Sequence, residues 1–393
     1  MAAGRAARMM RGHTLPLLLG LGMAAAAAQA GPPPASPASP AIPVASFNDG
    51  VNHWRSGHAE GYARLQPQQY RQIADNLLLL QRRSGGWPVN QDPLRVLDGA
   101  AREAARVAQD EPGGSFDNRT TYTQVDYLAE AFARSGDTRY RDAALRGLDF
   151  ILDQQIETCG GWPHSVPART DYHDRITFAD DVTSGVLTTL RQVQTAPRFA
   201  FVDATRRARV ASAVQRGDAC LLRLQVRQHG QPTIWAGQYD AATLQPAPGR
   251  KFELAALVTD ESVGVVRYLM SIPDPSPQTV QAIEGAFAWF QANALHGLRL
   301  QTVDAPAEQF AHHRSTQDRQ LLADPGAPPL WGRFHDLADN TVVLADRQGQ
   351  RLQTYAQVGR ERRTGYHWYG TWPQALLDRD APAWRARTGH RAP

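Results

Sequence analysis

Hydrophobic residues recur at helical spacing along most of the chain beyond residue 64. This pattern predicts helices over residues 65–83, 94–108, 120–133, 139–155, 177–194, 202–228, 258–270 and 276–292. Residues 298–303 and 330–352 instead have the composition of short strands and loops, with a hairpin expected around Gln348 and Gly349. The chain is therefore predicted to be dominated by α-helices, with short β-hairpins in its C-terminal part.

Three of the predicted helices end at similar turns that lead to a tryptophan. Two of the turns read Gly-Gly-Trp-Pro and contain Trp87 and Trp162, and the third, around Gly230, precedes Trp235. A regular repeat of helical hairpins suits an architecture in which each hairpin buries its apolar face against its neighbours. We expect an α/α toroid of about three hairpins. Trp87 and Trp162 are then either rigid plates that contact a ligand or plugs in the core of the ring.

The first 46 residues differ from the rest of the chain. Arg5, Arg8 and Arg11 precede an apolar run, and Ala28-Gln29-Ala30 fits a signal-peptidase site. The predicted domains are a signal peptide at 1–30, a Pro/Ala/Ser-rich linker at 31–46 and one large domain at 47–393. We therefore expect an exported protein that is either secreted or periplasmic. After removal of the signal peptide it should be monomeric and not bound to a membrane.

Composition and charge exclude few classes of function. The 393 residues are 42% hydrophobic and 20% charged, as in ordinary globular proteins. Loss of the three leader arginines lowers the formal charge from +4 to about +1, so a nucleic-acid partner gains no support. Cys159 and Cys220 are compatible with one disulfide in an oxidising compartment, or Cys220 packs in the core.

Carboxylates at two predicted helix starts are the first candidates for chemistry. Asp117 begins one helix, and the adjacent pair Asp180 and Asp181 begins another. Taken singly, each is an ordinary N-cap or acidic first turn. If the two helices lie side by side, these carboxylates can share a hard cation such as Ca²⁺.

Three arginines in predicted loops or strand ends complete the candidate set. Arg250, Arg319 and Arg333 each carry a planar fork that binds a carboxylate through two hydrogen bonds. Exposed arginines that simply interact with solvent are the alternative for each one. A cleft that combines a bound cation with several arginines suits an acidic polysaccharide.

A series of motifs occurs along the chain in this order: GGWPVNQD, DNRTTYTQ, CGGWPHSVP, YHDRITFADD, PGRKFELAALVTDESVGVVRYLMSI, APPLWGRF and GYHWYGTWP. Together they resemble the family-10 pectate lyases over roughly residues 65–378. The resemblance implies an α/α-toroid catalytic domain and calcium-assisted β-elimination of (1→4)-α-D-galacturonan, which yields 4,5-unsaturated oligogalacturonides. The implied partners are polygalacturonate or its oligomers, and the implied cofactor is Ca²⁺.

The resemblance also assigns roles to residues. It implies that Asp117 and Asp180 bind calcium, with Asp181 as the alternative to Asp180. Arg250 is the implied base, whose pKa would be lowered by calcium and neighbouring arginines. Arg319 and Arg333 are the implied ligands of substrate carboxylates, and we add four further residues to the expected substrate-binding set: Trp87, Trp162, His173 and Tyr239.

This chain departs from the family pattern at several positions. Arg119-Thr120 stands where the family has Gly-Ala, Ala179 replaces an Asn, and Tyr239 replaces a His. Arg119 next to Asp117 is expected to compete with the metal or to take its place. A catalytically degenerate uronate-binding protein of the same fold is therefore the alternative function, and a hydrolase that uses Asp180 and Asp181 is a third.

Overall fold

The structure is a computed structural model that describes residues 40–58, 61–311 and 313–389. The predicted signal peptide and most of the predicted linker lie outside the described residues. The end of that linker packs against the domain, since Ile42 is buried in the main core. Among the described helices, none has both the length and the apolar composition that crossing a bilayer requires.

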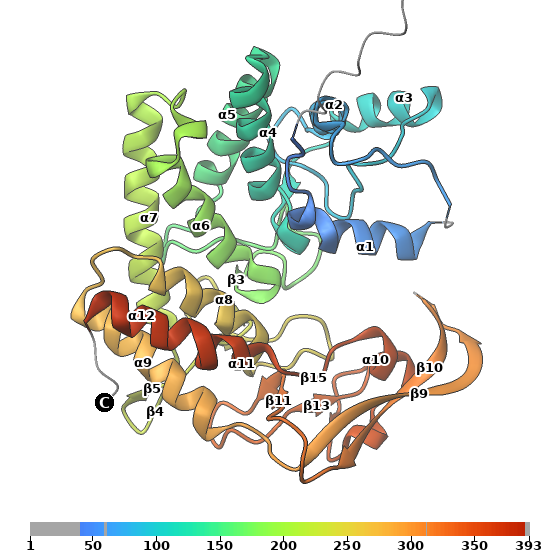
Figure 1. The fold of residues 1–393 in the computed structure, drawn as a ribbon, viewed down its shortest axis with the longest axis vertical. Helices are drawn as coiled ribbons and strands as arrows, with labels where there is room; N and C mark the ends of the chain where they lie inside the picture. The colour runs from blue at the N-terminus through green and yellow to red at the C-terminus, as the bar shows by residue number, and fades with distance from the viewer. Residues whose placement is uncertain (1–39, 59–60, 312, 390–393) are drawn as a thin grey trace, which may run out of the picture. The chain divides into compact units, whose positions relative to one another are not determined.

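Helices account for most of the regular structure in the described ranges (Figure 1). They are α1 (Asn48–Gly57), α2 (Tyr70–Leu80), α3 (Gly99–Ala108), α4 (Tyr122–Ser135), α5 (Thr138–Asp153), α6 (Val182–Thr195), α7 (Ala204–Leu224), α8 (Thr259–Met270), α9 (Pro277–Ala292), α10 (Arg360–Gly365), α11 (Trp372–Ala375) and α12 (Ala381–Thr388). Helices α2 to α9 confirm the predicted ones. The pattern did not predict α1 or the helices after residue 359.

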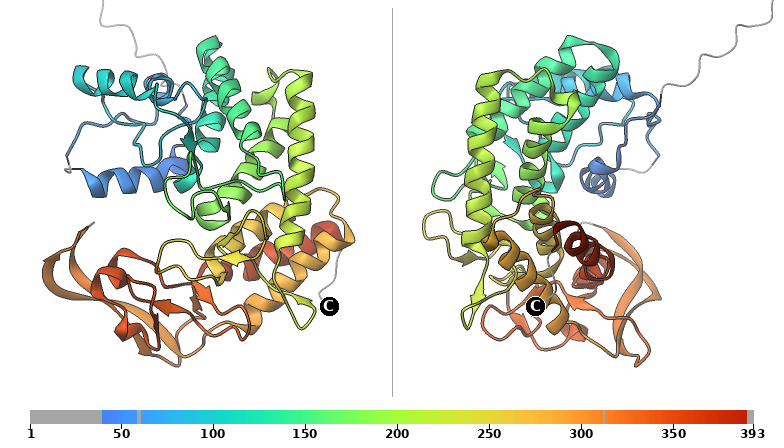
Figure 2. Two further views of the ribbon diagram at one scale, coloured as in Figure 1. Left: turned by 180° about the vertical axis from the view of Figure 1, so that it is seen from behind. Right: turned by 60° about the vertical axis from the view of Figure 1, so that its left-hand side comes forward.

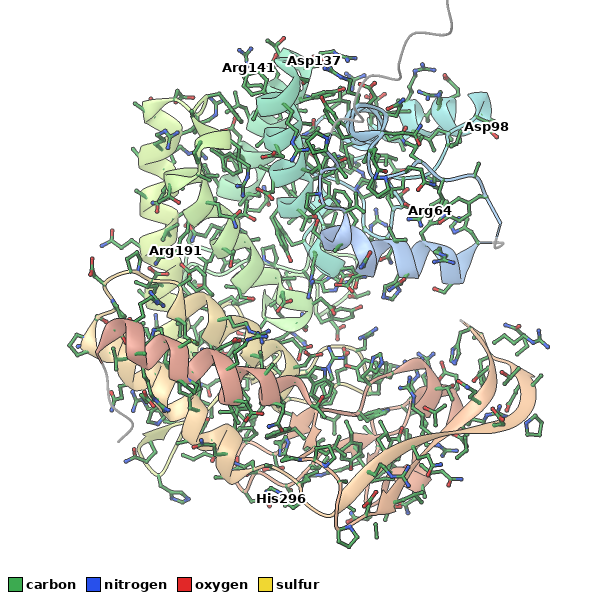
Figure 3. The ribbon with its side chains drawn as sticks, viewed as in Figure 1. Arg64, Asp98, Asp137, Arg141, Arg191 and His296 are labelled. Atoms are coloured by element: carbon green, nitrogen blue, oxygen red, sulfur yellow. A yellow bond between two sulfur atoms is a disulfide. The ribbon has the colours of Figure 1, made fainter. Side chains whose placement is uncertain are left out.

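Several helices begin where a side chain caps free backbone N–H groups. Asp98 accepts a hydrogen bond from the N–H of Ala101 (2.7 Å) at the start of α3, and Asp137 accepts one from the N–H of Arg139 (3.0 Å) at the start of α5. Figure 3 labels both aspartates at the outer ends of their helices. These local caps agree with the helix starts that periodicity predicts.

The predicted repeat of helix ends is present in the structure and is held by buried glutamines. Gln155, just after α5, donates from Nε2 to the carbonyl oxygens of Gly160 (2.7 Å) and Ala213 (2.8 Å). Gln81 and Gln225, which follow α2 and α7, make equivalent pairs of bonds to their own turn and to a later helix. Each glutamine thus ties a turn to the next hairpin.

The tryptophans that follow these turns are structural. Trp87 and Trp162 are at most 1% exposed, and their Nε1 groups donate to the carbonyls of Leu77 and Ile151, both at 2.8 Å. Trp235 repeats this contact with the carbonyl of Leu221. The prediction that Trp87 and Trp162 contact a ligand is wrong, because their rings fill the core between helices and no face is open.

Replacing Trp162 by Ala should therefore reduce stability and not substrate affinity. Removing a fully buried indole leaves a cavity and an unpaired carbonyl, and we expect the free energy of unfolding to fall by about 3–5 kcal/mol. Chemical denaturation measures this loss. A variant of unchanged stability but weakened substrate binding would contradict the structural role.

The strands are short and antiparallel, apart from one long hairpin of β9 (Leu298–Gln309) and β10 (Arg314–Ala323), and all form pairs except β3, β6 and β7, which form a three-stranded sheet. The other strands are β1 (Gly114–Ser115), β2 (Ser165–Val166), β3 (Ile176–Thr177), β4 (Arg227–Gln228), β5 (Gln231–Pro232), β6 (Gln238–Tyr239), β7 (Pro246–Ala247), β8 (Leu257–Val258), β11 (Trp331–Gly332), β12 (Phe334–His335), β13 (Leu344–Ala345), β14 (Arg351–Leu352) and β15 (Tyr369–Gly370). The pair β13 and β14 confirms the hairpin predicted around Gly349, whose φ of 91° requires glycine.

Two apolar cores support the strand and helix parts. The larger core runs through the helices, and a smaller core lies under the C-terminal strands, with Phe252 and Trp368 among its members. Both views in Figure 2 show α8 and α9 beside the long helix α7, with the strands beyond them.

A disulfide joins Cys159 to Cys220 across a sequence separation of 61 residues. Of the two possibilities for these cysteines, the structure therefore has the disulfide.

Candidate active site

A cavity of about 500 Å³ is lined mainly by polar side chains. Its walls come from α1, from two short helical turns that precede α4 and α6, from the segments 237–261 and 333–367, and from Asn90, His164 and Tyr172. The two turns are η2 (Asp117–Arg119) and η3 (Ala179–Asp181). Five of the predicted site residues meet in this cavity: Asp117, Asp180, Asp181, Arg250 and Arg333.

The first turn presents Asp117 because its main chain is fixed from both sides. The N–H groups of Phe116 and Asp117 donate to the carbonyl of His164 (3.0 and 3.2 Å), and the hydroxyl of Thr121 donates to the carbonyl of Ser115 (2.7 Å). Asn118 is held at a φ of 49°. Left-handed backbone at a non-glycine residue carries strain that the surrounding contacts must hold.

The second turn repeats this geometry one hairpin later. The N–H groups of Phe178 and Ala179 donate to the carbonyl of Gly237 (2.9 and 3.0 Å), and Asp180 and Asp181 have φ values of 54° and 56°. Asn118 and Asp180 therefore occupy equivalent positions, and Asp117 corresponds to Ala179. The carboxylates of Asp117 and Asp180 are brought together from non-equivalent positions of the repeat.

Asp117, His164 and Asp180 each place one ligand atom within 4.8 Å of the other two. The Nε2 atom of His164 lies 3.2 Å from Oδ1 of Asp117. Burial and the charge of Asp117 raise the pKa of Asp180, while His164 lowers the pKa of Asp117 against the effect of burial. Two carboxyl groups this close need either a shared proton or a cation.

The donor set fits a hard cation such as Ca²⁺ through its oxygen atoms. Asp117 and Asp180 supply the carboxylates that calcium prefers. The imidazole nitrogen of His164 is not a typical calcium ligand, and its contact with Asp117 suits it to orient that carboxylate. These residues fit calcium with His164 as a supporting group.

Arg119 and Asp181 pair with each other. Arg119 lies 2.8 Å from Asp181 through Nη2 and 3.1 Å from Asp49 of α1 through Nε. The guanidinium of Arg119 points to these two carboxylates, so the structure gives no support to the expectation that Arg119 takes the place of the metal beside Asp117. The ion pair engages the carboxylate of Asp181, and the group of close metal-binding side chains contains Asp180 and not Asp181, which favours Asp180 of the two alternatives.

Arg250 faces the cavity and is held by Glu253. Its Nε donates to Glu253 (2.9 Å), its Nη2 forms an ion pair with the same carboxylate, and the hydroxyl of Tyr366 donates to Glu253 at 2.8 Å. Burial opposes the charge on Arg250, but Glu253 outweighs it and raises the pKa of Arg250 above its usual value. This direction holds for the protein without metal, so the expectation that calcium and neighbouring arginines lower the pKa of Arg250 stays a prediction.

Arg333 is the second guanidinium of the cavity. It forms a buried ion pair with Glu261, and its guanidinium carbon lies 4.9 Å from the centre of the Tyr366 ring. The corresponding distance for Arg250 is 5.5 Å. Tyr366 thus packs against both guanidinium groups, which leaves two positive charges beside the carboxylates of Asp117 and Asp180.

Three further predicted residues do not line this cavity. Tyr239 is buried, with its hydroxyl donating to the carbonyl of Leu224 (2.7 Å). The ring of His173 stacks on His164 at 4.7 Å between centroids. Arg319 lines a separate cavity of about 580 Å³ under β10. Burial excludes Tyr239 from contact with a ligand, whereas the roles of His173 and Arg319 in substrate binding stay predictions.

Sequence reasoning missed several residues of the site. His164 directly follows the Gly-Gly-Trp-Pro turn, and a titratable residue after such a fixed turn was the signal available. Glu253 lies three residues after Arg250, a spacing at which an acid can pair with a base. Asp260 and Glu261 lie in the stretch 248–272, which carries part of the family resemblance, and both line the cavity.

Asp260 should make the metal-free protein less stable as pH rises. Burial, then the charge of Glu261, raises the pKa of Asp260 from 3.8 to about 7. The folded state therefore binds this proton more tightly than the unfolded state, and the unfolding free energy falls between about pH 4 and pH 7. Asp260→Asn should flatten this decline in thermal unfolding scans, whereas the control Asp240→Asn, outside the cavity, should not. An unchanged slope in Asp260→Asn would contradict the assignment.

Comparisons with known proteins agree on one family. A family model described as pectic acid lyase matches residues 81–377. The family 10 polysaccharide lyase from Cellvibrio cellulosa is 28% identical, with a TM-score of 0.69 over 88% of this chain and 95% of that one. A mutant of that lyase in complex with trigalacturonic acid gives 28% identity and a TM-score of 0.68 over 87% and 96%. A search of curated proteins found no match.

Proposed function

Because this chain belongs to the pectic acid lyase family and is a polysaccharide lyase, we propose that its substrate is (1→4)-α-D-galacturonan, cleaved by calcium-assisted β-elimination. The products would be 4,5-unsaturated oligogalacturonides. A family 10 relative binds trigalacturonic acid, which supports an acidic galacturonate chain as the ligand here. We also propose that the helical hairpins close into a toroid and that the protein is a monomer. Residues 1–30 would direct its export to the periplasm or the medium.

The observation that carries the proposal is the convergence of two kinds of group in one cavity. The carboxylates of Asp117 and Asp180 come from two different hairpins, and Arg250 and Arg333 come from later loops. Chemistry next to a sugar carboxylate needs positive charge at that carboxylate and a group that accepts a proton. This cavity offers both.

The charge of the cavity supports a requirement for a cation. Seven carboxyl groups face three guanidinium groups in its lining, a formal excess of four negative charges with histidines neutral. The acidic residues are Asp49, Asp117, Asp180, Asp181, Glu253, Asp260 and Glu261, and the basic ones are Arg119, Arg250 and Arg333. A polyanionic substrate would be repelled unless positive charge is added.

Asp117 and Asp180 would hold the calcium ion, and His164 would orient Asp117. A bound calcium ion would supply positive charge that stabilises the anion formed next to the substrate carboxylate. Arg333 keeps its own charge because Glu261 and other acids raise its pKa despite burial. Its guanidinium can therefore bind the substrate carboxylate as a permanent cation.

Arg250 is the group placed to remove the proton from carbon 5 of the uronate. Nε and Nη2 of this arginine donate hydrogen bonds to Glu253, whereas Nη1 has no hydrogen-bond partner among the described residues. When Nη1 of the neutral guanidine accepts the proton, the C5–H electrons remain on the substrate as an anion delocalised into its carboxylate. These electrons form the C4–C5 double bond as the C4–O4 bond breaks, and the departing oxygen takes a proton from water.

The raised pKa of Arg250 predicts that this reaction needs alkaline conditions. The fraction of neutral guanidine rises with pH, so the rate on the acidic side of the profile should rise with it. Binding of a cation at Asp117 and Asp180 adds positive charge near Arg250 and lowers its pKa. The same cation thus serves substrate binding and the base.

The test is to incubate the protein with polygalacturonate and CaCl₂ at alkaline pH. Formation of unsaturated product is followed by its ultraviolet absorbance. New reducing ends without unsaturation would indicate hydrolysis and overturn the elimination mechanism. Binding of the polymer without any cleavage would favour the degenerate uronate-binding protein.

A further inference from the structure

Helix α1 contributes to the cavity although it lies outside the region that the family model matches. The matched region begins at residue 81, whereas Asp49, Asn52 and His53 of α1 line the cavity. These positions are spaced three and four residues apart, so they share one face of the helix. Figure 1 shows α1 at the edge of the helical part, on the side that faces α10 and the β9–β10 hairpin.

Contacts on the cavity face and on another side fix this helix in place. Asp49 is held 3.1 Å from Arg119, which also pairs with Asp181 next to the candidate metal ligand Asp180. On another side of α1, the guanidinium of Arg95 lies 3.6 Å from the centre of the Trp54 ring. The position of α1 is thereby tied to the turns η2 and η3.

Asn52 and His53 have capacity for binding that the fold does not use. Both side chains are exposed, and neither makes a side-chain hydrogen bond to another residue in the described part of the chain. An amide and an imidazole together offer donors and acceptors that suit sugar hydroxyl and carboxylate groups. Asp49, by contrast, is engaged with Arg119.

We propose that α1 forms a flanking subsite in which Asn52 and His53 hydrogen-bond to a further acidic sugar residue of the bound chain, away from the bond that is cleaved. This inference rests on the proposed function, since it takes the substrate to be an acidic polysaccharide that fills the cavity. A chain that extends across the cavity from the carboxylates of Asp117 and Asp180 to α1 gains these additional contacts, so the subsite should favour longer chains.

Binding measurements on oligomers of two lengths test the subsite. Titration calorimetry with trigalacturonate and hexagalacturonate, in the presence of CaCl₂, is carried out on Arg250→Ala protein so that no turnover occurs. Two hydrogen bonds lost from a solvated site are worth roughly a fivefold or larger change in affinity. We expect Asn52→Ala with His53→Ala to weaken hexagalacturonate binding by that factor and to leave trigalacturonate binding almost unchanged.

The control variant is Ser56→Ala, which alters an exposed residue of the same helix outside the cavity lining. It should retain the preference for the longer oligomer, and thermal unfolding should show that all variants fold alike. An unchanged affinity of the double variant for hexagalacturonate overturns the subsite, as does an equal loss for both oligomers. The result does not depend on catalysis, which the cleavage assay of the unmodified enzyme decides separately.

Discussion

Arg250→Ala should lower the rate of unsaturated-product formation by about 10³-fold or more. General bases contribute roughly 10²–10⁴-fold to enzymatic rates, and Arg250 also supplies positive charge next to Asp117 and Asp180. The measurement is kcat from ultraviolet absorbance with polygalacturonate at saturating CaCl₂. Retained turnover would contradict the role of Arg250 as the base.

A second variant separates chemistry from folding. Glu253 is 14% exposed in its side chain, and removal of its arginine leaves a largely buried carboxylate unpaired, which destabilises proteins. The double variant Arg250→Ala with Glu253→Gln removes this charge, and it should fold normally but remain inactive. Arg347→Ala is the matched control, because Arg347 pairs with Glu361 outside both cavities. This control should keep kcat within about twofold.

Asp117→Asn should weaken calcium binding and stop the reaction at moderate calcium concentrations. The amide keeps the shape of the side chain but removes one of the two carboxylates that face each other. We expect the Kd for calcium, measured by calorimetry with the metal alone, to rise roughly 10²-fold or more. Activity should fall in parallel and return in part at high CaCl₂. Chelation should also stop the unmodified enzyme.

Asp181→Asn distinguishes the two adjacent aspartates. Asp181 is paired with Arg119, so its loss should change the Kd for calcium much less than the loss of Asp117 or Asp180. Asp240→Asn, which changes an aspartate of an exposed turn, controls for general loss of negative charge. Full activity of the unmodified enzyme in excess chelator would show that no metal takes part in the reaction.

Several features of the site could be predicted from the sequence because they are local or rest on many motifs together. Helical periodicity and turn residues gave the positions of α2 to α9 and the repeat of turns before Trp87, Trp162 and Trp235. Asp117 and Asp180 stand at helix starts in the sequence itself. Arg250 and Arg333 were assigned through the resemblance, and the structure brings both into the cavity.

Other features depend on the direction of side chains, which a linear pattern does not encode. Asp180 and Asp181 are neighbours in sequence, yet successive residues with positive φ point one toward Asp117 and the other toward Arg119. Likewise, Trp87 and Trp162 follow flexible glycines and read as surface plates. The structure instead buries both rings in the helical core, where each indole N–H donates to a carbonyl of the preceding helix.

The sequence by itself determined the helical architecture, its repeat, and the residue types available for chemistry. These follow from spacing along the chain, since a helix or a turn is stabilised largely by residues near one another. Only the tertiary structure decided which groups pair. It placed His164 beside Asp117, Glu261 beside Arg333 and Tyr366 against Glu253, because packing joins segments that lie between 47 and 113 residues apart.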